Sequence, residues 1–154
     1  QNFLNTLDIS TYSFTRISKS ASKIMRNGGS LLTLTYVGSN KTTPNYNVMG
    51  VAKAALETSV RYLSVDLGKN NIRVNAISAG PMKTIAGAAI SGARHVYRYS
   101  EKIAPLQKNP DLKQVGNAAL YLLSDISSGV TGLTHYVDGG LKVVGIPNQD
   151  IVSI

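Results

Sequence analysis

Residues 30–53, SLLTLTYVGSNKTTPNYNVMGVAK, contain three successive local patterns. The first seven residues, SLLTLTY, form an apolar run with few polar breaks, which is typical of a parallel strand buried on both faces. Residues 37–44, VGSNKTTP, hold a glycine and a proline and are expected to form a loop. From Asn45 to about Leu67 the apolar residues fall on one broad helical face. The stretch therefore predicts a strand, a loop and a helix, the repeating unit of an α/β fold.

The segments on either side extend this alternation. Residues 8–27 have apolar positions mostly three or four apart, so we expect a helix that the Gly28-Gly29 pair ends. Residues 72–78, IRVNAIS, predict a second strand. The turn AGP at 79–81 ends it, because proline cannot extend a strand ladder.

The last third of the chain supplies another helix and another strand. Residues 82–107 are expected to be irregular with short helical patches. A helix is expected over 111–125, with Asp111 near its N-cap, and a third strand with its turn over 133–140, LTHYVDGG. Strands separated by helices in this order imply a parallel sheet with right-handed crossovers.

The fold class expected is α/β, the second half of a doubly wound parallel-sheet, Rossmann-type fold. Such a sheet has about six strands in two halves. The chain lacks the Gly-rich phosphate turn and the acidic residue about 20 positions later that mark a dinucleotide site. It also starts at Gln1 rather than Met. We therefore expect residues 1–154 to be the C-terminal portion of one domain, whose N-terminal nucleotide-binding half of roughly 110 residues lies outside this sequence.

Composition excludes several classes of site. The absence of cysteine excludes disulfides, thiolate ligands and a cysteine nucleophile, and it fits a cytoplasmic protein. The two histidines, His95 and His135, are too far apart in sequence to suggest a metal site, so no metal is expected. No apolar run approaches the about 20 residues of a membrane span.

The net charge of +8 is spread along the chain, with a modest cluster at Arg94, Arg98 and Lys102. Its simplest interpretation is a set of solvated helix faces. Dense basic patches with aromatic platforms, typical of nucleic-acid binding, are not seen. An acidic protein partner or an anionic cofactor is the alternative.

Tyr46 and Lys53 are candidates for chemistry because seven residues are two helical turns, which places both on one face. A neighbouring ammonium favours the phenolate, so we expect it to lower the tyrosine pKa. Such a tyrosine can donate a hydrogen bond to an oxygen that becomes negative in a transition state. On spacing alone, a packed tyrosine and a solvated lysine are the commoner outcome.

Two further motifs, NAISAGP at 75–81 and YVDGG at 136–140, resemble the short-chain dehydrogenase/reductase superfamily. Its ordinary Tyr-x-x-x-Lys signature is altered here, because Met49 stands four residues before Lys53. The spacing Tyr-x6-Lys, with Tyr36 ten residues before Tyr46, resembles the bacterial NADH-dependent enoyl-acyl carrier protein reductases. The strings LLTLTYVGSNKTTPNYNVMGVAKAALE and RVNAISAGPMKT agree with that family, and the resemblance covers nearly all of residues 8–145.

The resemblance implies an oxidoreductase of fatty acid elongation that reduces the trans-2 double bond of enoyl-acyl carrier protein thioesters with hydride from NADH. Tyr46 would hydrogen-bond the thioester carbonyl and stabilise the enolate. Lys53 would hold the nicotinamide ribose and support the tyrosine, and Tyr36 would line the same site. Residues that discriminate NADH from NADPH would lie in the missing half.

The resemblance assigns further contacts and partners. The expected cofactor contacts, besides Lys53, are Gly80, Pro81, Met82 and Thr84. The expected substrate contacts, besides the two tyrosines, are Met49, Ala86, Ile90 and Arg94. Arg94 matches a basic position that receives the acidic acyl carrier protein, and Ala93 stands where relatives commonly have phenylalanine. A cytoplasmic homotetramer is implied, with no nucleic-acid or membrane partner.

Two other functions stay open. One is a short-chain reductase that acts on a ketone or alcohol, although Met49 in place of the usual tyrosine speaks against it. The other is a non-enzymatic fragment that binds a partner without turnover. Because the nucleotide-binding half is absent, we expect the chain to be inactive alone.

Overall fold

The three strands form one parallel sheet in a computed structural model that describes residues 1–85 and 91–151. Strand β1 (Gly29–Thr35) pairs with β2 (Ile72–Ala79) over its whole length, from Gly29 opposite Ile72 to Thr35 opposite Ser78. The shorter β3 (Thr134–Val137) pairs with the other edge of β2. The carboxyl ends of all three strands therefore meet at one edge of the sheet.

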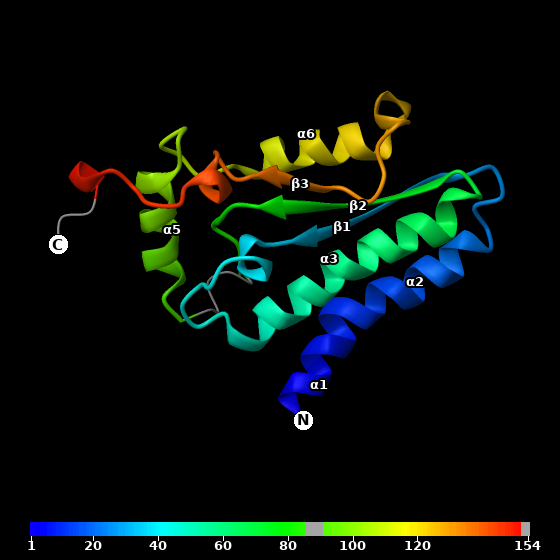
Figure 1. Cartoon of the computed structure of the whole chain (residues 1–154), viewed down its shortest axis with the longest axis horizontal. Coiled ribbons are helices and arrows are strands. Elements are labelled where there is room, and N and C mark those ends of the chain that lie inside the picture. Colours follow the sequence, from blue (N-terminus) through cyan, green and yellow to red (C-terminus); the bar gives the residue numbers. More distant parts are fainter. Residues whose placement is uncertain (86–90, 152–154) are drawn as a thin grey trace.

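Helices cover both faces of this sheet (Figure 1). Helices α2 (Ser13–Ser22) and α3 (Asn47–Gly68) lie on one face, and α6 (Leu112–Leu123) lies on the other. Helix α5 (Ala93–Ile103) stands beyond the carboxyl ends of the strands. The predicted α/β fold with a parallel sheet is confirmed.

The core lies on both sides of β2, as expected for a strand buried on both faces. Val60 of α3 packs against Ile72, Val74 and Ala76. On the opposite face, Ile77 and Ala79 pack with the buried residues Val115 and Leu122 of α6. Alternate residues of β2 thus face alternate helical layers.

The N-terminal helix differs from the expected span of 8–27. A short helix α1 (Asn2–Leu7) precedes a π-helical turn over Asp8–Tyr12, and α2 then ends at Ser22. The end is early because the Lys23 N–H bonds to the Ser20 carbonyl, three residues back, which tightens the last turn. Gly28 then takes a positive φ of 82° and leads the chain into β1.

Helix α5 corrects a second expectation, because residues 93–103 form a continuous helix rather than irregular patches. Its sequence is strongly polar, with few apolar residues to signal a core-facing stripe. The half-buried Val96 and Ile103 and the buried Ser100 lie four and three residues apart, which places them on one face.

Helix α6 begins as the sequence predicts, with Asp111 as its N-cap. The Asp111 carboxylate accepts from the Gln114 N–H at 2.7 Å, and the Gln114 side chain accepts from the Asp111 N–H at 2.9 Å. These reciprocal bonds satisfy two donors that the first turn leaves free. The helix ends at Leu123, two residues earlier than expected.

The guanidinium of Arg73 on β2 holds the end of α6. It donates to the carbonyls of Leu122, Ser124 and Val130 at 2.9, 3.0 and 3.3 Å, and to Ser127 Oγ at 2.9 Å. A cation at a helix C-terminus satisfies carbonyls that have no partner within the helix and interacts favourably with the helix dipole.

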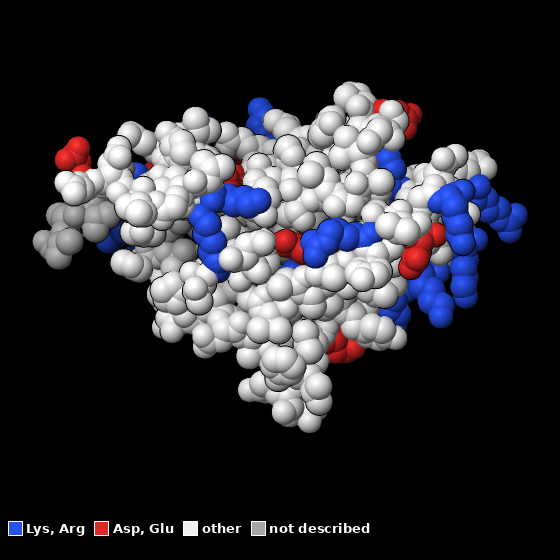
Figure 2. All heavy atoms as spheres, in the orientation of Figure 1, with Lys and Arg blue, Asp and Glu red and all other residues white. Residues whose placement is uncertain are grey.

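Positive charge is distributed over the visible face rather than gathered at one groove (Figure 2), with a group of basic side chains at the end where α2 and α3 terminate. Within the two described ranges, no helix is both long and apolar enough to span a membrane.

Candidate active site

A cavity of about 380 Å³ opens at the carboxyl ends of β1 and β2. In open parallel sheets this edge is where ligands bind. The cavity brings together seven residues that the sequence predicted for the site: Tyr36, Tyr46, Lys53, Gly80, Pro81, Met82 and Thr84. These residues come from three segments of the chain, so the fold gathers them at one place.

Tyr36 and Tyr46 meet edge to face in this cavity. Their ring centroids are 5.1 Å apart, with 64° between the ring planes. Tyr36 follows the last residue of β1, and Tyr46 is the N-cap of α3, so that helix begins two residues later than the expected Asn45. Asn45 and Asn47 both have positive φ, of 62° and 36°. Asparagine tolerates this region better than most residues, which explains the Asn-Tyr-Asn sequence.

Two glycines allow the loop after β1 to lie close to α3. A Cβ on Gly38 would lie 2.6 Å from Cδ1 of the Tyr46 ring. A Cβ on Gly50, in the first turn of α3, would lie 2.9 Å from the Gly38 carbonyl oxygen. Glycine at both positions is therefore what permits the two tyrosine rings to pack together. Neither glycine was predicted from the sequence to be part of the site.

The expected effect of Lys53 on Tyr46 is wrong. Burial raises the pKa of Tyr46 to about 12, and the neighbouring Tyr36 adds to the rise. The ammonium of Lys53 is engaged elsewhere, since Nζ donates to the Leu34 carbonyl at 2.9 Å. Tyr46 is therefore a protonated phenol at neutral pH, ready to donate a hydrogen bond.

The other two ionisable groups of the cavity are also shifted by burial. Burial raises the pKa of Tyr36, and a hydrogen bond with the Thr43 side chain partly opposes this. Burial lowers the pKa of Lys53, and the negative charge of Glu57 partly opposes the shift. Both shifts follow the rule that burial disfavours the charged form of a side chain.

The end of β2 forms the opposite wall. The Gly80 N–H donates to the Val137 carbonyl at 2.8 Å, which ties this end to β3. A Cβ on Gly80 would lie 2.8 Å from Cδ of Pro110 and 3.0 Å from Cα of Asp138. Glycine thus lets the β2 end approach the turn after β3, and Pro81 and Met82 then continue along the cavity wall.

Two predicted residues that the structure describes, Met49 and Arg94, are not gathered in this cavity. Met49 is half-buried, but its sulfur lies 3.7 Å from Ser10 Oγ and it is not among the lining residues. Exposed Arg94 lines a neighbouring hollow together with Lys83 and Arg98, while Ala93 lines the cavity itself. Ala86 and Ile90 lie outside the described residues.

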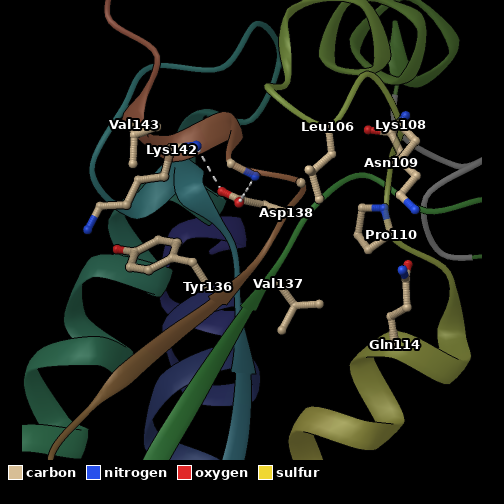
Figure 3. Close-up of a pocket in the computed structure, with 12 residues that line it drawn as sticks. Leu106, Lys108, Asn109, Pro110, Gln114, Tyr136, Val137, Asp138, Lys142 and Val143 are labelled. Carbon is tan, nitrogen blue, oxygen red and sulfur yellow. Dashed lines mark hydrogen bonds between the residues drawn. The ribbon is translucent and has the colours of Figure 1, made fainter.

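A separate cavity of about 520 Å³ lies beside the turn after β3 (Figure 3). The strand ends at Val137 and the turn follows at residues 138–140, as the sequence predicted for 133–140. The Asp138 carboxylate accepts from the N–H groups of Gly140 and Lys142, at 2.9 and 2.8 Å, and this folds the turn. Of the predicted site residues that the structure describes, none lines this cavity. No group of three or more potential metal-ligating side chains occurs in 1–85 and 91–151.

Comparison with known proteins identifies the family. Residues 1–142 match the family model described as "Enoyl-(Acyl carrier protein) reductase". The chain is 57% identical to "Enoyl-[acyl-carrier-protein] reductase [NADH] 1" of Rhizobium meliloti (strain 1021), over 99% of the chain and 56% of that protein. It is 56% identical to the Rickettsia typhi (strain ATCC VR-144 / Wilmington) protein named "Enoyl-[acyl-carrier-protein] reductase [NADH] FabI", over 94% of the chain and 56% of that protein.

Solved structures of reductases of this family superimpose closely on the chain. FabI from Candidatus Liberibacter asiaticus superimposes with a TM-score of 0.93 at 50% identity, over 96% of this chain and 57% of that one. A reductase from Anaplasma phagocytophilum, crystallised with NAD, gives 0.91 at 55% identity, over 96% and 56%. The chain spans little more than half the length of the curated relatives it matches. The chain belongs to the enoyl-(acyl carrier protein) reductase family, as its motifs predicted.

Proposed function

We propose that the protein to which this chain belongs reduces the trans-2 double bond of enoyl-acyl carrier protein thioesters with hydride from NADH, as a step of fatty acid elongation. The observation that carries this proposal is the cavity in which Tyr36, Tyr46 and Lys53 face the end of β2. The curated relatives with 50–57% identity carry the name of this activity.

The cavity fits the nicotinamide end of NADH. Gly80 brings bare backbone to the carboxyl edge of the sheet, and the half-buried ammonium of Lys53 is suited to hold ribose hydroxyls. Pro81, Met82 and Thr84 extend the same wall. NADH, when bound, supplies the hydride that is added to the β-carbon. The NADH in the relatives' names and the NAD in the Anaplasma phagocytophilum structure support this choice of cofactor.

Tyr46 is the proposed hydrogen-bond donor to the thioester carbonyl. When hydride adds to the β-carbon, negative charge moves onto this carbonyl oxygen, and a donor already in place there lowers the barrier. A phenol with a pKa of about 12 keeps its proton over the whole neutral range. Tyr36 packs against the Tyr46 ring, so we assign it to the wall that fixes the donor and contacts the acyl chain.

The position of Tyr46 also suits an enoyl rather than a carbonyl substrate. A ketone reductase needs its acid at the carbonyl carbon that receives hydride. In an enoyl thioester the oxygen lies two atoms further from the carbon that receives it. We propose that moving the tyrosine from the position of Met49 to Tyr46, about one helical turn earlier, meets this difference.

The remaining parts of the proposal concern the whole protein. An N-terminal half supplies the Gly-rich turn and the adenine site. Exposed Arg94, beside Lys83 and Arg98, receives the acidic acyl carrier protein. Met49, Ala86 and Ile90 contribute to the acyl site. The protein works as a cytoplasmic homotetramer, and residues 1–154 alone are inactive.

The test is substrate choice by the full-length protein, meaning this chain together with its proposed N-terminal half. NADH oxidation is followed with a trans-2-enoyl thioester and, separately, with the 3-oxoacyl thioester of the same length. We expect turnover of the enoyl thioester alone. Reduction of the 3-oxo compound would indicate a carbonyl reductase, and no turnover of either would refute the proposed reaction.

A further inference from the structure

Glu57 is a buried carboxylate that accepts a hydrogen bond from Thr35, one of the residues lining the candidate active site. It lies on α3 one helical turn after Lys53 and is only 6% exposed. Its Oε1 accepts from Thr35 Oγ1 at 2.7 Å and from Ser39 Oγ at 2.5 Å. Its Oε2 accepts from Asn40 Nδ2 at 3.2 Å. A buried charged group requires such hydrogen-bond partners, because its transfer out of water costs much free energy when they are absent.

The three donors all belong to the segment that carries Tyr36. Thr35 immediately precedes the tyrosine, and Ser39 and Asn40 follow it by three and four residues. The single helical turn Val37–Ser39 lies within this segment, and the Ser39 N–H donates to the Tyr36 carbonyl at 3.0 Å. One carboxylate therefore holds both ends of the turn from which Tyr36 projects.

The same turn also sets the position of Tyr46. It contains Gly38, whose missing Cβ leaves room for the Tyr46 ring. One turn before Glu57, Lys53 Nζ donates to the carbonyl of Leu34, the residue next to Thr35. Two side chains from the same face of α3 thus anchor the end of β1, and both tyrosines depend on where that end lies.

We propose that Glu57 is a positioning residue for the reductase site: its carboxylate fixes the turn over residues 35–40 and thereby places Tyr36 and Tyr46 at the substrate. The effect of Glu57 on catalysis rests on the proposed function. Its hold on the turn over residues 35–40 rests on the hydrogen bonds alone. A carboxylate suits the task, since it accepts several hydrogen bonds at once and bonds to charged acceptors are the stronger ones.

The experiment compares two substitutions in the full-length protein, Glu57→Ala and Glu57→Gln. Alanine removes both acceptor oxygens and so all three hydrogen bonds. A misplacement of about 1 Å costs up to about 100-fold in rate, so we expect kcat to fall about 10- to 100-fold. Glutamine retains an acceptor for Thr35 and Ser39, so it should recover most of this loss. The KM for NADH should change much less than kcat, because Lys53 keeps its bond to Leu34.

Asp66→Ala is the matched control. It removes an exposed carboxylate from the same helix without touching the turn, so kcat and KM should stay at the wild-type values. Thermal unfolding of each variant shows how much protein is folded at the assay temperature. A role in folding alone would lower the melting temperature of Glu57→Ala while leaving kcat per folded enzyme unchanged, and that result would overturn the proposal.

A crystal structure of Glu57→Ala gives a readout that does not depend on turnover. We expect the ring centroids of Tyr36 and Tyr46 to move from their separation of 5.1 Å, and unmoved rings would overturn the inference. If the wild-type protein reduces no enoyl thioester, the proposed function fails, but this comparison still decides the placement role of Glu57. If Glu57→Ala does not fold, Ser39→Ala removes one donor instead and must lower kcat; an unchanged kcat would overturn the proposal.

Discussion

Replacing Gly38 by alanine should impair catalysis more than folding. The new Cβ would lie 2.6 Å from Cδ1 and 2.8 Å from Cε1 of the Tyr46 ring, and 3.1 Å from Cδ1 of Tyr36. Ordinary van der Waals contact begins at 3.4 Å. The Tyr46 ring must therefore retreat by about 0.8 Å, or the turn must move away from α3 by a similar amount.

The expected magnitudes separate the two effects. Gly38 is not among the glycines with positive φ, so its backbone accepts alanine. Alanine then gains about 0.4–1 kcal/mol by restricting the unfolded chain, against about 1–3 kcal/mol for the overpacking, which leaves a modest net loss of stability. A displacement of about 1 Å at the reacting groups costs up to about 100-fold in rate, equivalent to about 2.7 kcal/mol in the barrier.

The assay is kcat of the full-length protein with NADH and a trans-2-enoyl thioester, together with urea unfolding. Gly68→Ala is the control, because Gly68 lies at the far end of α3 and its added Cβ would meet nothing within 4 Å. It should leave kcat unchanged and increase stability by about 0.5–1 kcal/mol. Gly38→Ala with kcat within about threefold of the wild type would refute the reasoning that the rings must keep their present positions.

Two further predictions concern stability. Arg73→Met removes four hydrogen bonds at the end of α6 and should lower the free energy of unfolding of the full-length protein in urea by about 2–4 kcal/mol. The control Arg61→Met, on the exposed side of α3, should lower it by less than about 0.5 kcal/mol. Equal losses in the two variants would contradict this. The pKa of Tyr46 is raised from 10.0 to about 12 on folding, so Tyr46 contributes stability that is fully present below pH 10 and is lost as the pH rises through about 12. Tyr46→Phe should flatten the fall in unfolding free energy over this range, and an unchanged pH profile would contradict the shift.

The sequence predicted the sheet well because its strands carry strong local signals. The apolar run of residues 30–36 and the strand-then-proline pattern of 72–81 each indicate a buried strand without help from the rest of the chain. The capping box at Asp111 is likewise a local pattern. Helix α5 was missed because its sequence is polar on average, although its few apolar residues do fall on one face. The exact bounds of α2 depend on a π turn with no sequence signature.

The composition of the site was predictable, but its electrostatics were not. Family motifs located Tyr36, Tyr46 and Lys53, and the fold gathers them in one cavity. The pKa of Tyr46 depends on burial and on where the Lys53 ammonium lies, and that ammonium bonds to a carbonyl 19 residues earlier. No spacing rule shows such a contact.

Glu57 was missed for the same reason. A glutamate on an amphipathic helix is ordinarily solvated. Its burial here follows from donors 22, 18 and 17 residues earlier in the chain. A search for acidic residues on the apolar face of α3 would have provided the only local hint.

The most direct test of the central claim is the turnover of Tyr46→Phe in the full-length protein. Phenylalanine keeps the ring that packs against Tyr36 and removes only the hydroxyl. With an enoyl thioester and NADH, we expect kcat to fall about 100- to 1,000-fold, the usual effect of losing one donor to a developing oxyanion, while the KM for NADH changes little. Full turnover by this variant would contradict the assignment of Tyr46 as the donor to the thioester oxygen.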